Sequence, residues 1–311
     1  MTGLLDIHCH GAAGAELGSS RAASRRALAH HAAAGVNGVV ASLVSARPAD
    51  LEERVGVLAG LVASGELAGI HLEGPFLSPT RRGAHDAALL LDPDVGLVER
   101  LVEVAAEEGA PSAIRQLTYA PELPGSDALV RALVAHGIRP AVGHTDADAS
   151  VVARAVASIA DRQGFPALVT HLFNGMPPFH HRDGGPAAAA LTAAARGEAV
   201  VELIADGVHL APEVVRMVFE TVGPAAIALV SDATPATGVG DGTHRLGDLE
   251  DEVSAGVART TDTGAIAGST ATLADCLRWA VDVAGVEPGD ARRAATITPA
   301  AAVGLGRPQV G

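Results

Sequence analysis

The sequence predicts a single α/β domain folded as a (β/α)8 TIM barrel. Its 311 residues suit such a barrel, which needs roughly 250 residues plus insertions. Short apolar runs of β type alternate with Ala-, Leu- and Val-rich stretches of helical type, which is the pattern of βαβ units in a parallel sheet. Eight runs of each kind favour a closed barrel over an open doubly wound sheet. The content of 48% hydrophobic and 19% charged residues supplies a large core and argues against disorder.

The predicted strands are short, apolar and spaced along the whole chain. They cover residues 4–8, 38–43, 69–72, 114–119, 140–144, 167–171, 200–205 and 227–231. Because aromatic residues make up only 2% of the chain, the sheet and its surroundings must be packed with Ala, Val, Leu and Ile.

The predicted helices alternate with these strands. They cover residues 21–34, 49–63, 93–108, 126–136, 147–160, 186–196, 211–222 and 270–284. Asp92 followed by Pro93 is typical of an N-cap and a first helical residue. Gly109, Gly137 and Gly223 stand where three of the helices should end.

Residues 237–268 fit neither pattern. They are rich in Gly, Thr and Asp and lie between the eighth strand and its helix. We interpret them as an insertion, with a hairpin as one form it can take, within a single barrel domain that spans residues 1–311.

Composition excludes several functions. The net charge of −14 argues against a nucleic-acid partner, because the phosphate backbone demands a basic face. All basic residues are Arg, so the absence of Lys excludes a Walker phosphate loop, a Schiff-base lysine and a metal site bridged by a modified lysine. Two cysteines, Cys9 and Cys276, are too few for a disulfide scaffold and indicate the cytoplasm. No apolar run approaches about 18 residues, so no membrane association is expected.

Polar residues gather where the predicted strands end, and in a barrel these ends form the active-site face. They are His8, His10, Glu73, His144, His171, Asp206, His209 and Asp232. One such histidine alone is usually structural, but their recurrence at six strand ends indicates a site. Imidazole and carboxylate groups that converge are typical ligands of a divalent transition metal.

The triplet His8-Cys9-His10 has a simple geometry. Alternation along a strand places both imidazoles on one side and Cys9 on the other, where we interpret it as a small buried apolar residue. Six further histidines are predicted to lie on the surface or in loops. They are residues 30, 31, 136, 180, 181 and 244.

Six motifs carry a resemblance to a known family. They are HLEGPFLSP (71–79), RGAH (82–85), GHTDA (143–147), THLFNGM (170–176), ADGVH (205–209) and SDAT (231–234). In this order they resemble the N-acetylglucosamine-6-phosphate deacetylases of the amidohydrolase superfamily, and the match runs from about Leu5 to Gly304. HLEGPF together with HLFN is more specific to this branch than the HxH or SDA motifs.

The resemblance implies a catalytic divalent metal ion, with Zn, Fe, Mn or Co as candidates, bound by Glu73, His144 and His171. Some members lack the HxH pair and use one ion, whereas others keep it and hold two. This sequence keeps the pair, which leaves open a second ion bound by His8, His10, Glu73 and Asp232.

The resemblance also implies roles for residues around the metal. Asp232 matches the carboxylate that acts as acid and base, and His85 is a hydrogen-bond donor to the oxyanion. Arg182 is the best candidate for a phosphate contact, since a guanidinium group donates two hydrogen bonds at once. The substrate-contacting positions are Ala84, Asn174, Gly175, Arg182, Asp206, His209, Ile266, Ala267 and Gly268.

The implied activity is hydrolysis of the acetamide of N-acetylglucosamine 6-phosphate to glucosamine 6-phosphate and acetate, in amino-sugar catabolism. The substrate is then a small phosphorylated amino sugar, and a homodimer is one assembly that relatives suggest. Two alternatives stay open: an amidohydrolase acting on another N-acyl sugar or a cyclic amide, and an inactive barrel used as a binding scaffold. Relatives add a small β domain from segments flanking the barrel, which this sequence is expected to lack.

Overall fold

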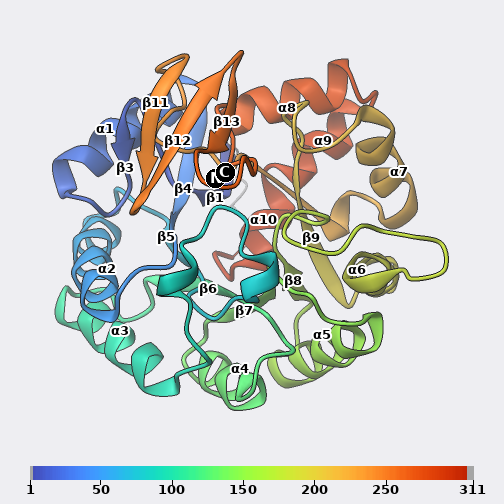
Figure 1. The fold of residues 1–311 in the computed structure, drawn as a ribbon, viewed down its shortest axis with the longest axis horizontal. Coiled ribbons are helices and arrows are strands. Elements are labelled where there is room, and N and C mark those ends of the chain that lie inside the picture. Colours follow the sequence, from blue (N-terminus) through green and yellow to red (C-terminus); the bar gives the residue numbers. More distant parts are fainter. Residues whose placement is uncertain (1–2, 307–311) are drawn as a thin grey trace.

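The computed structural model describes residues 3–306 and contains an eight-stranded parallel sheet in chain order (Figure 1). The strands are β1 (Leu4–Cys9), β4 (Val36–Leu43), β5 (Gly69–Glu73), β6 (Ile114–Tyr119), β7 (Arg139–Val142), β8 (Ala167–Val169), β9 (Ala199–Ile204) and β10 (Ile227–Val230). Each pairs with its neighbour in parallel. All eight predicted strands are confirmed, with small differences at their ends.

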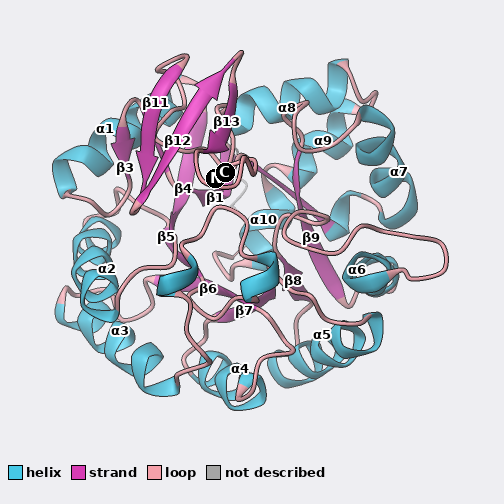
Figure 2. Cartoon of the chain, viewed as in Figure 1, coloured by secondary structure: helices cyan, strands magenta, loops and turns pink. Residues whose placement is uncertain are grey.

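Helices surround this sheet as a ring (Figure 2). They are α1 (Arg21–Ala33), α2 (Pro48–Ala63), α3 (Val95–Glu107), α4 (Ser126–Ala135), α5 (Ala149–Gln163), α6 (Gly185–Ala195), α7 (Pro212–Val222) and α8 (Leu273–Asp282). The predicted TIM barrel is therefore confirmed.

The predicted start of α3 is wrong by two residues. Asp94, not Asp92, is the N-cap, because its carboxylate accepts a hydrogen bond from the Leu97 amide at 3.2 Å. The predicted helix ends are confirmed: Gly109 and Gly137 follow α3 and α4 with left-handed backbones, and Gly223 is the C-cap of α7.

The two edges of the sheet, β1 and β10, meet near their carboxyl ends. Cys9 and Ala233 form a parallel bridge, and the Asp232 amide donates a hydrogen bond to the His8 carbonyl at 2.9 Å. This contact completes the barrel on the face where the predicted site residues lie. It also places His8 and Asp232, which are 224 positions apart, side by side.

Side chains strengthen the same junction. The buried carboxylate of Asp6 accepts hydrogen bonds from the Ser231 hydroxyl at 2.5 Å and from the Ser231 amide at 3.2 Å. Burial raises the pKa of Asp6 to about 6, although the bonds from Ser231 counteract part of that increase.

The core has two layers, one between the helices and the sheet and one inside the barrel. The inner layer includes Leu5, Val40 and Val200, and Ala300 and Val303 pack against it. Ala300 belongs to α10 (Ile297–Ala302), which follows α9 (Pro288–Ala294). Neither helix was predicted, because both are too short to show a helical repeat of large apolar residues.

The insertion is a small antiparallel sheet rather than the single hairpin suggested by sequence. Its strands are β11 (Gly242–Leu246), β12 (Leu249–Ser254) and β13 (Val257–Thr260). Val253 and Ala258 form a buried cluster with Ala236 and Ala267, and Ala84 packs against it. The insertion thus lies against the loop that follows β5 at the mouth of the barrel.

Shorter elements complete the described chain. They are β2 (Gly11–Ala12) paired with β3 (Ala15–Glu16), and the 3-10 turns η1 (Pro79–Arg81), η2 (Ala87–Leu89) and η3 (Pro224–Ala226). Over residues 3–306, every helix is too short or too polar to cross a membrane.

Candidate metal centre and active site

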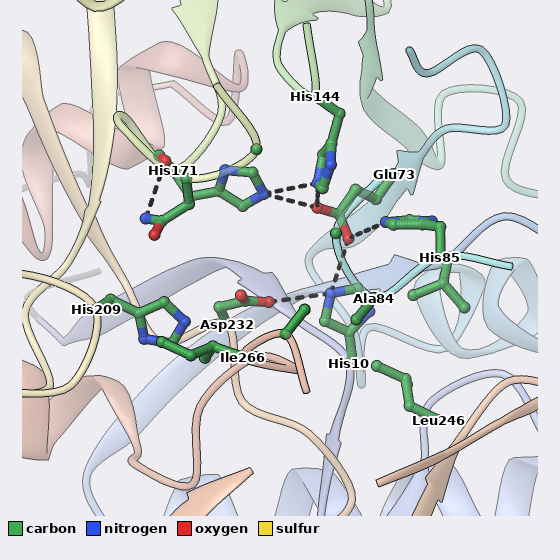
Figure 3. Close-up of a pocket in the computed structure, with 16 residues that line it drawn as sticks. His10, Glu73, Ala84, His85, His144, His171, His209, Asp232, Leu246 and Ile266 are labelled. Carbon is green, nitrogen blue, oxygen red and sulfur yellow. Dashed lines mark hydrogen bonds and ion pairs between the residues drawn. The ribbon is translucent and has the colours of Figure 1, made fainter. Parts of the chain in front are cut away.

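A cavity of about 240 Å³ opens at the carboxyl ends of the strands (Figure 3). Most of the predicted site residues line it, together with Val44, Gly83, Leu246 and Ala265, which were not predicted. The predicted residues that line it are His10, Glu73, Ala84, His85, His144, His171, Asn174, Gly175, His209, Asp232, Ile266 and Gly268. His8 lies buried directly behind His10.

Glu73 stands at the centre of this group, and each of its oxygens faces a different set of nitrogens (Figure 3). Oε1 lies 3.0 Å from Nε2 of His144 and 2.9 Å from Nε2 of His171. Oε2 lies 3.2 Å from Nε2 of His10 and 3.6 Å from Nε2 of His8. One carboxylate therefore joins two clusters of donor atoms.

The first cluster is formed by Glu73, His144 and His171. Nε2 of His144 and Nε2 of His171 are 3.0 Å apart, and both rings are buried. His144 donates from Nδ1 to the Arg81 carbonyl at 2.8 Å, which leaves its Nε2 as an acceptor in the neutral ring. Two imidazole nitrogens this close to each other and to a carboxylate oxygen fit a cation between them. The donor set suits a borderline divalent ion such as zinc.

The second cluster is formed by His8, His10, Asp232 and the other oxygen of Glu73. Nε2 of His8 and Nε2 of His10 are 3.2 Å apart, and Asp232 Oδ1 lies 3.4 and 3.2 Å from them. The alternation predicted for His8 and His10 is confirmed, since both imidazoles face inward. The ligand atoms of His8, His10 and Asp232 converge closely enough to hold a divalent ion, and Oε2 of Glu73 lies beside them.

The charges of the two clusters compensate each other. Burial raises the pKa of Glu73 and Asp232, but the neighbouring histidines outweigh it and hold the pKa of Glu73 well below its usual range and that of Asp232 at about 2. Burial likewise lowers the pKa of His10, but hydrogen bonds with Asp232 and Glu73 raise it to about 9. Two buried carboxylates thus need positive charge between them, which fits a metal cation.

Three of these residues have left-handed backbones. The φ angles of His144, His171 and Asp232 are 46°, 26° and 51°, and each residue lies just after its strand. Such angles cost about 1–3 kcal/mol for residues other than glycine and concentrate at functional sites. The strand ends therefore turn these side chains into the cavity through a backbone geometry that the sequence pattern does not reveal.

Gly175 shows why a glycine follows Asn174 in the THLFNGM motif. Its φ is 61°, and a Cβ on it would lie 2.8 Å from Nδ1 of His144. Its carbonyl accepts a hydrogen bond from Thr145 at 3.0 Å. The loop after β8 therefore packs directly on the imidazole of His144.

His85 lies on the other side of Glu73. Its Nδ1 lies 3.3 Å from the Ser45 amide, which donates to it, and its Nε2 faces Glu73 Oε2 at 3.5 Å. Burial lowers the pKa of His85 and so favours the neutral ring. Because Nδ1 accepts from the Ser45 amide, that neutral ring carries its proton on Nε2. This nitrogen is a hydrogen-bond donor aimed into the cavity.

Three predicted substrate residues lie outside the lining of the cavity. Asp206 supports His209, accepting from its Nδ1 at 2.8 Å. Ala267 is buried behind the lining in the small cluster under the insertion. Arg182 is exposed on the loop between β8 and α6. The lining of the cavity, as far as the described residues form it, contains no arginine.

Sequence reasoning missed Glu202 and misplaced His31. Glu202 is fully buried in β9 and contacts His8; the signal was a lone charged residue within the apolar run AVVELI. His31 was predicted to be on the surface, but this prediction is wrong. The residue is buried on the side of α1 that faces the sheet, where its Nε2 lies 3.2 Å from the Cys9 thiol. Cys9 itself points outward from the barrel interior, as predicted.

Known proteins are similar to this chain in sequence and in fold. Residues 1–311 match the sequence profile of the Amidohydrolase family. The N-acetylglucosamine-6-phosphate deacetylase of Homo sapiens is 35% identical over 318 residues, which are 97% of this chain and 74% of that protein. The N-acetylgalactosamine-6-phosphate deacetylase of Escherichia coli O157:H7 is 30% identical over 306 residues, which are 97% of this chain and 77% of that protein.

A solved structure agrees with both the fold and the sequence. It is a mutant N-acetyl-D-glucosamine-6-phosphate deacetylase from Mycobacterium smegmatis in complex with N-acetyl-D-glucosamine-6-phosphate, 41% identical, with a TM-score of 0.89. The match covers 98% of this chain and 78% of that one. The chain therefore belongs to the amidohydrolase family, among the N-acetylglucosamine-6-phosphate deacetylases.

Proposed function

We propose that the chain hydrolyses the acetamide of N-acetylglucosamine 6-phosphate to glucosamine 6-phosphate and acetate. The observation that carries this proposal is the position of Asp232, a buried carboxylate that lies beside the metal-ligand cluster and lines the cavity. The deacetylases of this branch, one of them solved with this sugar phosphate, supply the substrate class.

Glu73, His144 and His171 would hold the primary divalent ion, and His8, His10, Glu73 and Asp232 a second one. When bound, such an ion lowers the pKa of water toward neutrality and polarises a carbonyl group. The chain contributes a buried set of fixed donor atoms, so no large rearrangement is needed on binding. Zinc, iron, manganese and cobalt all accept imidazole and carboxylate ligands of this kind.

Asp232 moves the proton in this reaction. With its pKa held at about 2, it is ionised at neutral pH and can accept a proton from the attacking water. It then donates this proton to the amine nitrogen, which is too basic to leave unprotonated. His85, with its proton on Nε2, donates a hydrogen bond to the developing oxyanion.

The sugar is bound by residues on the outer side of the cavity. Asn174, His209 and Ile266 line it together with Glu73, and Asp206 fixes the orientation of the His209 ring. Arg182 is the proposed phosphate contact, which requires its exposed loop to approach the bound ligand. A neighbouring subunit of a homodimer can supply further contacts to the phosphate, and this assembly stays a prediction. The cytoplasmic location also stays a prediction.

Acetate release after metal reconstitution tests this function. We expect turnover of N-acetylglucosamine 6-phosphate and little turnover of N-acetylglucosamine, since the latter lacks the phosphate. N-acetylgalactosamine 6-phosphate is the second candidate substrate, because a relative that acts on this sugar is 30% identical over nearly the whole chain. Absence of acetate from every phosphorylated sugar, despite bound metal, would overturn the proposal.

A further inference from the structure

Glu202 is the one buried carboxylate that contacts ligands of both clusters without being a ligand itself, within the part of the chain that the structure describes. Its Oε2 accepts from Nδ1 of His8 at 3.0 Å and from the backbone amide of His171 at 3.2 Å. Its Oε1 accepts from Nε2 of Gln116 at 3.3 Å. Gln116 is held in turn by the Ile7 carbonyl at 2.9 Å.

This contact distinguishes His8 from the other candidate histidine ligands. His144 uses its Nδ1 to bind a backbone carbonyl, and Nδ1 of His10 and of His171 has no hydrogen-bond partner among the described residues. Only His8 donates its Nδ1 proton to a carboxylate. Such a partner fixes the tautomer and the ring orientation and makes the opposite nitrogen a stronger donor to a metal.

We propose that Glu202 is a positioning residue that holds the His8 ring through Nδ1 with Nε2 directed at Nε2 of His10 and Oδ1 of Asp232, and so determines whether the second ion binds. Nε2 lies 3.2 Å from the first atom and 3.4 Å from the second. The neighbouring His71 cannot replace His8 as a ligand, because the hydroxyls of Ser42 and Thr118 bind both nitrogens of the His71 ring, at 2.9 and 2.8 Å.

The experiment is a metal titration of the purified protein in the absence of substrate. Glu202→Met removes the acceptor while keeping a similar length, and Glu202→Gln keeps one acceptor oxygen. Zn²⁺ bound per chain is measured by mass spectrometry after dialysis against buffered free Zn²⁺. In the unmodified chain we expect two ions. In Glu202→Met, the Kd of the second ion should rise about 10–100-fold, the usual effect of removing a partner of a metal ligand.

Thr118→Val is the matched control. Thr118 is as buried as Glu202 and lies in the same barrel interior, but among residues 3–306 its hydroxyl contacts only His71 and Thr170, at 2.8 and 2.7 Å. We expect this variant to bind both ions like the unmodified chain. Glu202→Gln should bind the second ion more tightly than Glu202→Met does, because one acceptor for His8 remains.

The result that supports the proposal is a weakening of the second ion in Glu202→Met that clearly exceeds any weakening of the first, whose ligand His171 loses only a contact of its backbone amide. Equal weakening of both ions, the same weakening in Thr118→Val, or a single ion in the unmodified chain would overturn it. The inference rests on the metal-dependent reaction proposed above. Because metal content is measured without substrate, a failure of the deacetylase assay would not change this readout.

Discussion

At the scale of single residues, the histidines of the site are held from behind as well as by Glu73. His144 donates to the Arg81 carbonyl, His8 to Glu202, and His85 accepts from the Ser45 amide. Each of these bonds assigns the proton to one ring nitrogen and so decides whether the other faces the cavity as an acceptor or a donor. The same residue type is thereby oriented as a candidate metal ligand in His144 and as a candidate hydrogen-bond donor in His85.

Asp232 provides the sharpest test at this scale. Asn has nearly the same shape but cannot accept the proton of the attacking water, so Asp232→Asn should fold and keep the primary ion. Turnover should fall about 10²–10⁴-fold, the usual effect of removing a general acid and base. The KM should change much less, since the sugar contacts are assigned to Asn174 and His209. The measurement is acetate release at saturating substrate, together with metal content.

Near-normal acetate release from Asp232→Asn would remove the residue from the mechanism. It would then serve only at the junction of β1 and β10, where its backbone amide bonds to the His8 carbonyl. That structural role depends on the backbone and is retained in the Asn variant.

At the scale of elements, the alternation of apolar runs predicted all eight strands, because buried parallel strands are short, continuous and bounded by helices. The motifs at the strand ends predicted which residues meet. The left-handed backbones of His144, His171 and Asp232 could not be predicted, since local propensity disfavours them and only the surrounding packing imposes them. Glu202 was missed because its partner His8 is 194 residues away in sequence.

The loop after β8 offers a test of that packing. In Gly175→Ala the added methyl would meet the His144 ring at 2.8 Å, on a backbone with φ of 61°. The displaced ring should bind the primary ion more weakly, and turnover should fall about tenfold or more, in line with a strain of about 1–3 kcal/mol. Bound metal and acetate release at limiting free Zn²⁺ are the readouts.

Gly137→Ala is the control for this variant. Gly137 has φ of 71° at the end of α4, but a Cβ there would meet nothing within 4 Å. It should lose stability through the same backbone strain while keeping its metal and turnover. If both variants lose metal alike, close packing on His144 is not the cause.

The insertion should give the protein a pH-dependent stability. Burial raises the pKa of Asp251 in β12 to about 6, with a further increase from Asp262 and a decrease from His244. The unfolded value is about 3.9. Asp251 therefore stabilises the fold fully below about pH 4, and this contribution is lost as the pH rises through 6, because the ionised carboxylate is poorly solvated and its Oδ1 has no partner.

In Asp251→Asn the side chain stays neutral at every pH. We expect the Tm of this variant to exceed that of the unmodified chain by a few degrees at pH 8 and to differ little from it at pH 4. Asp248→Asn, at an exposed residue of the same insertion, should show no such trend. A Tm difference for Asp251→Asn that is constant from pH 4 to pH 8 would exclude the titration of Asp251 as its source.

At the scale of the whole molecule, the barrel brings together residues from both ends of the chain. The sequence predicted this closure from the number of strands, but not how it is made, because the hydrogen bonds between Asp6 and Ser231 depend on the final register of β1 and β10. The position of Arg182 was likewise beyond prediction, since a motif assigns a residue to a loop and not to a cavity wall. Strand ends far apart in sequence thus share one buried candidate metal centre.

This sharing predicts that metal binding stabilises the entire barrel. The candidate ligands come from β1 and β5 and from the residues that follow β7, β8 and β10, so an ion bound among them links five strands that unfolding would separate. At a free metal concentration about 1,000 times the Kd, the gain is about 4 kcal/mol. For a chain of this size, a chelator should therefore lower the Tm by about 10 °C, and added Zn²⁺ should restore it.

His171→Ala lacks one ligand of the primary ion, so it should bind less than about half an equivalent there and respond much less to the chelator. Differential scanning calorimetry with and without chelator measures both effects. A Tm that is unchanged by chelation, in protein shown to have lost its metal, would mean that the packed strands and not the ion hold the mouth of the barrel together.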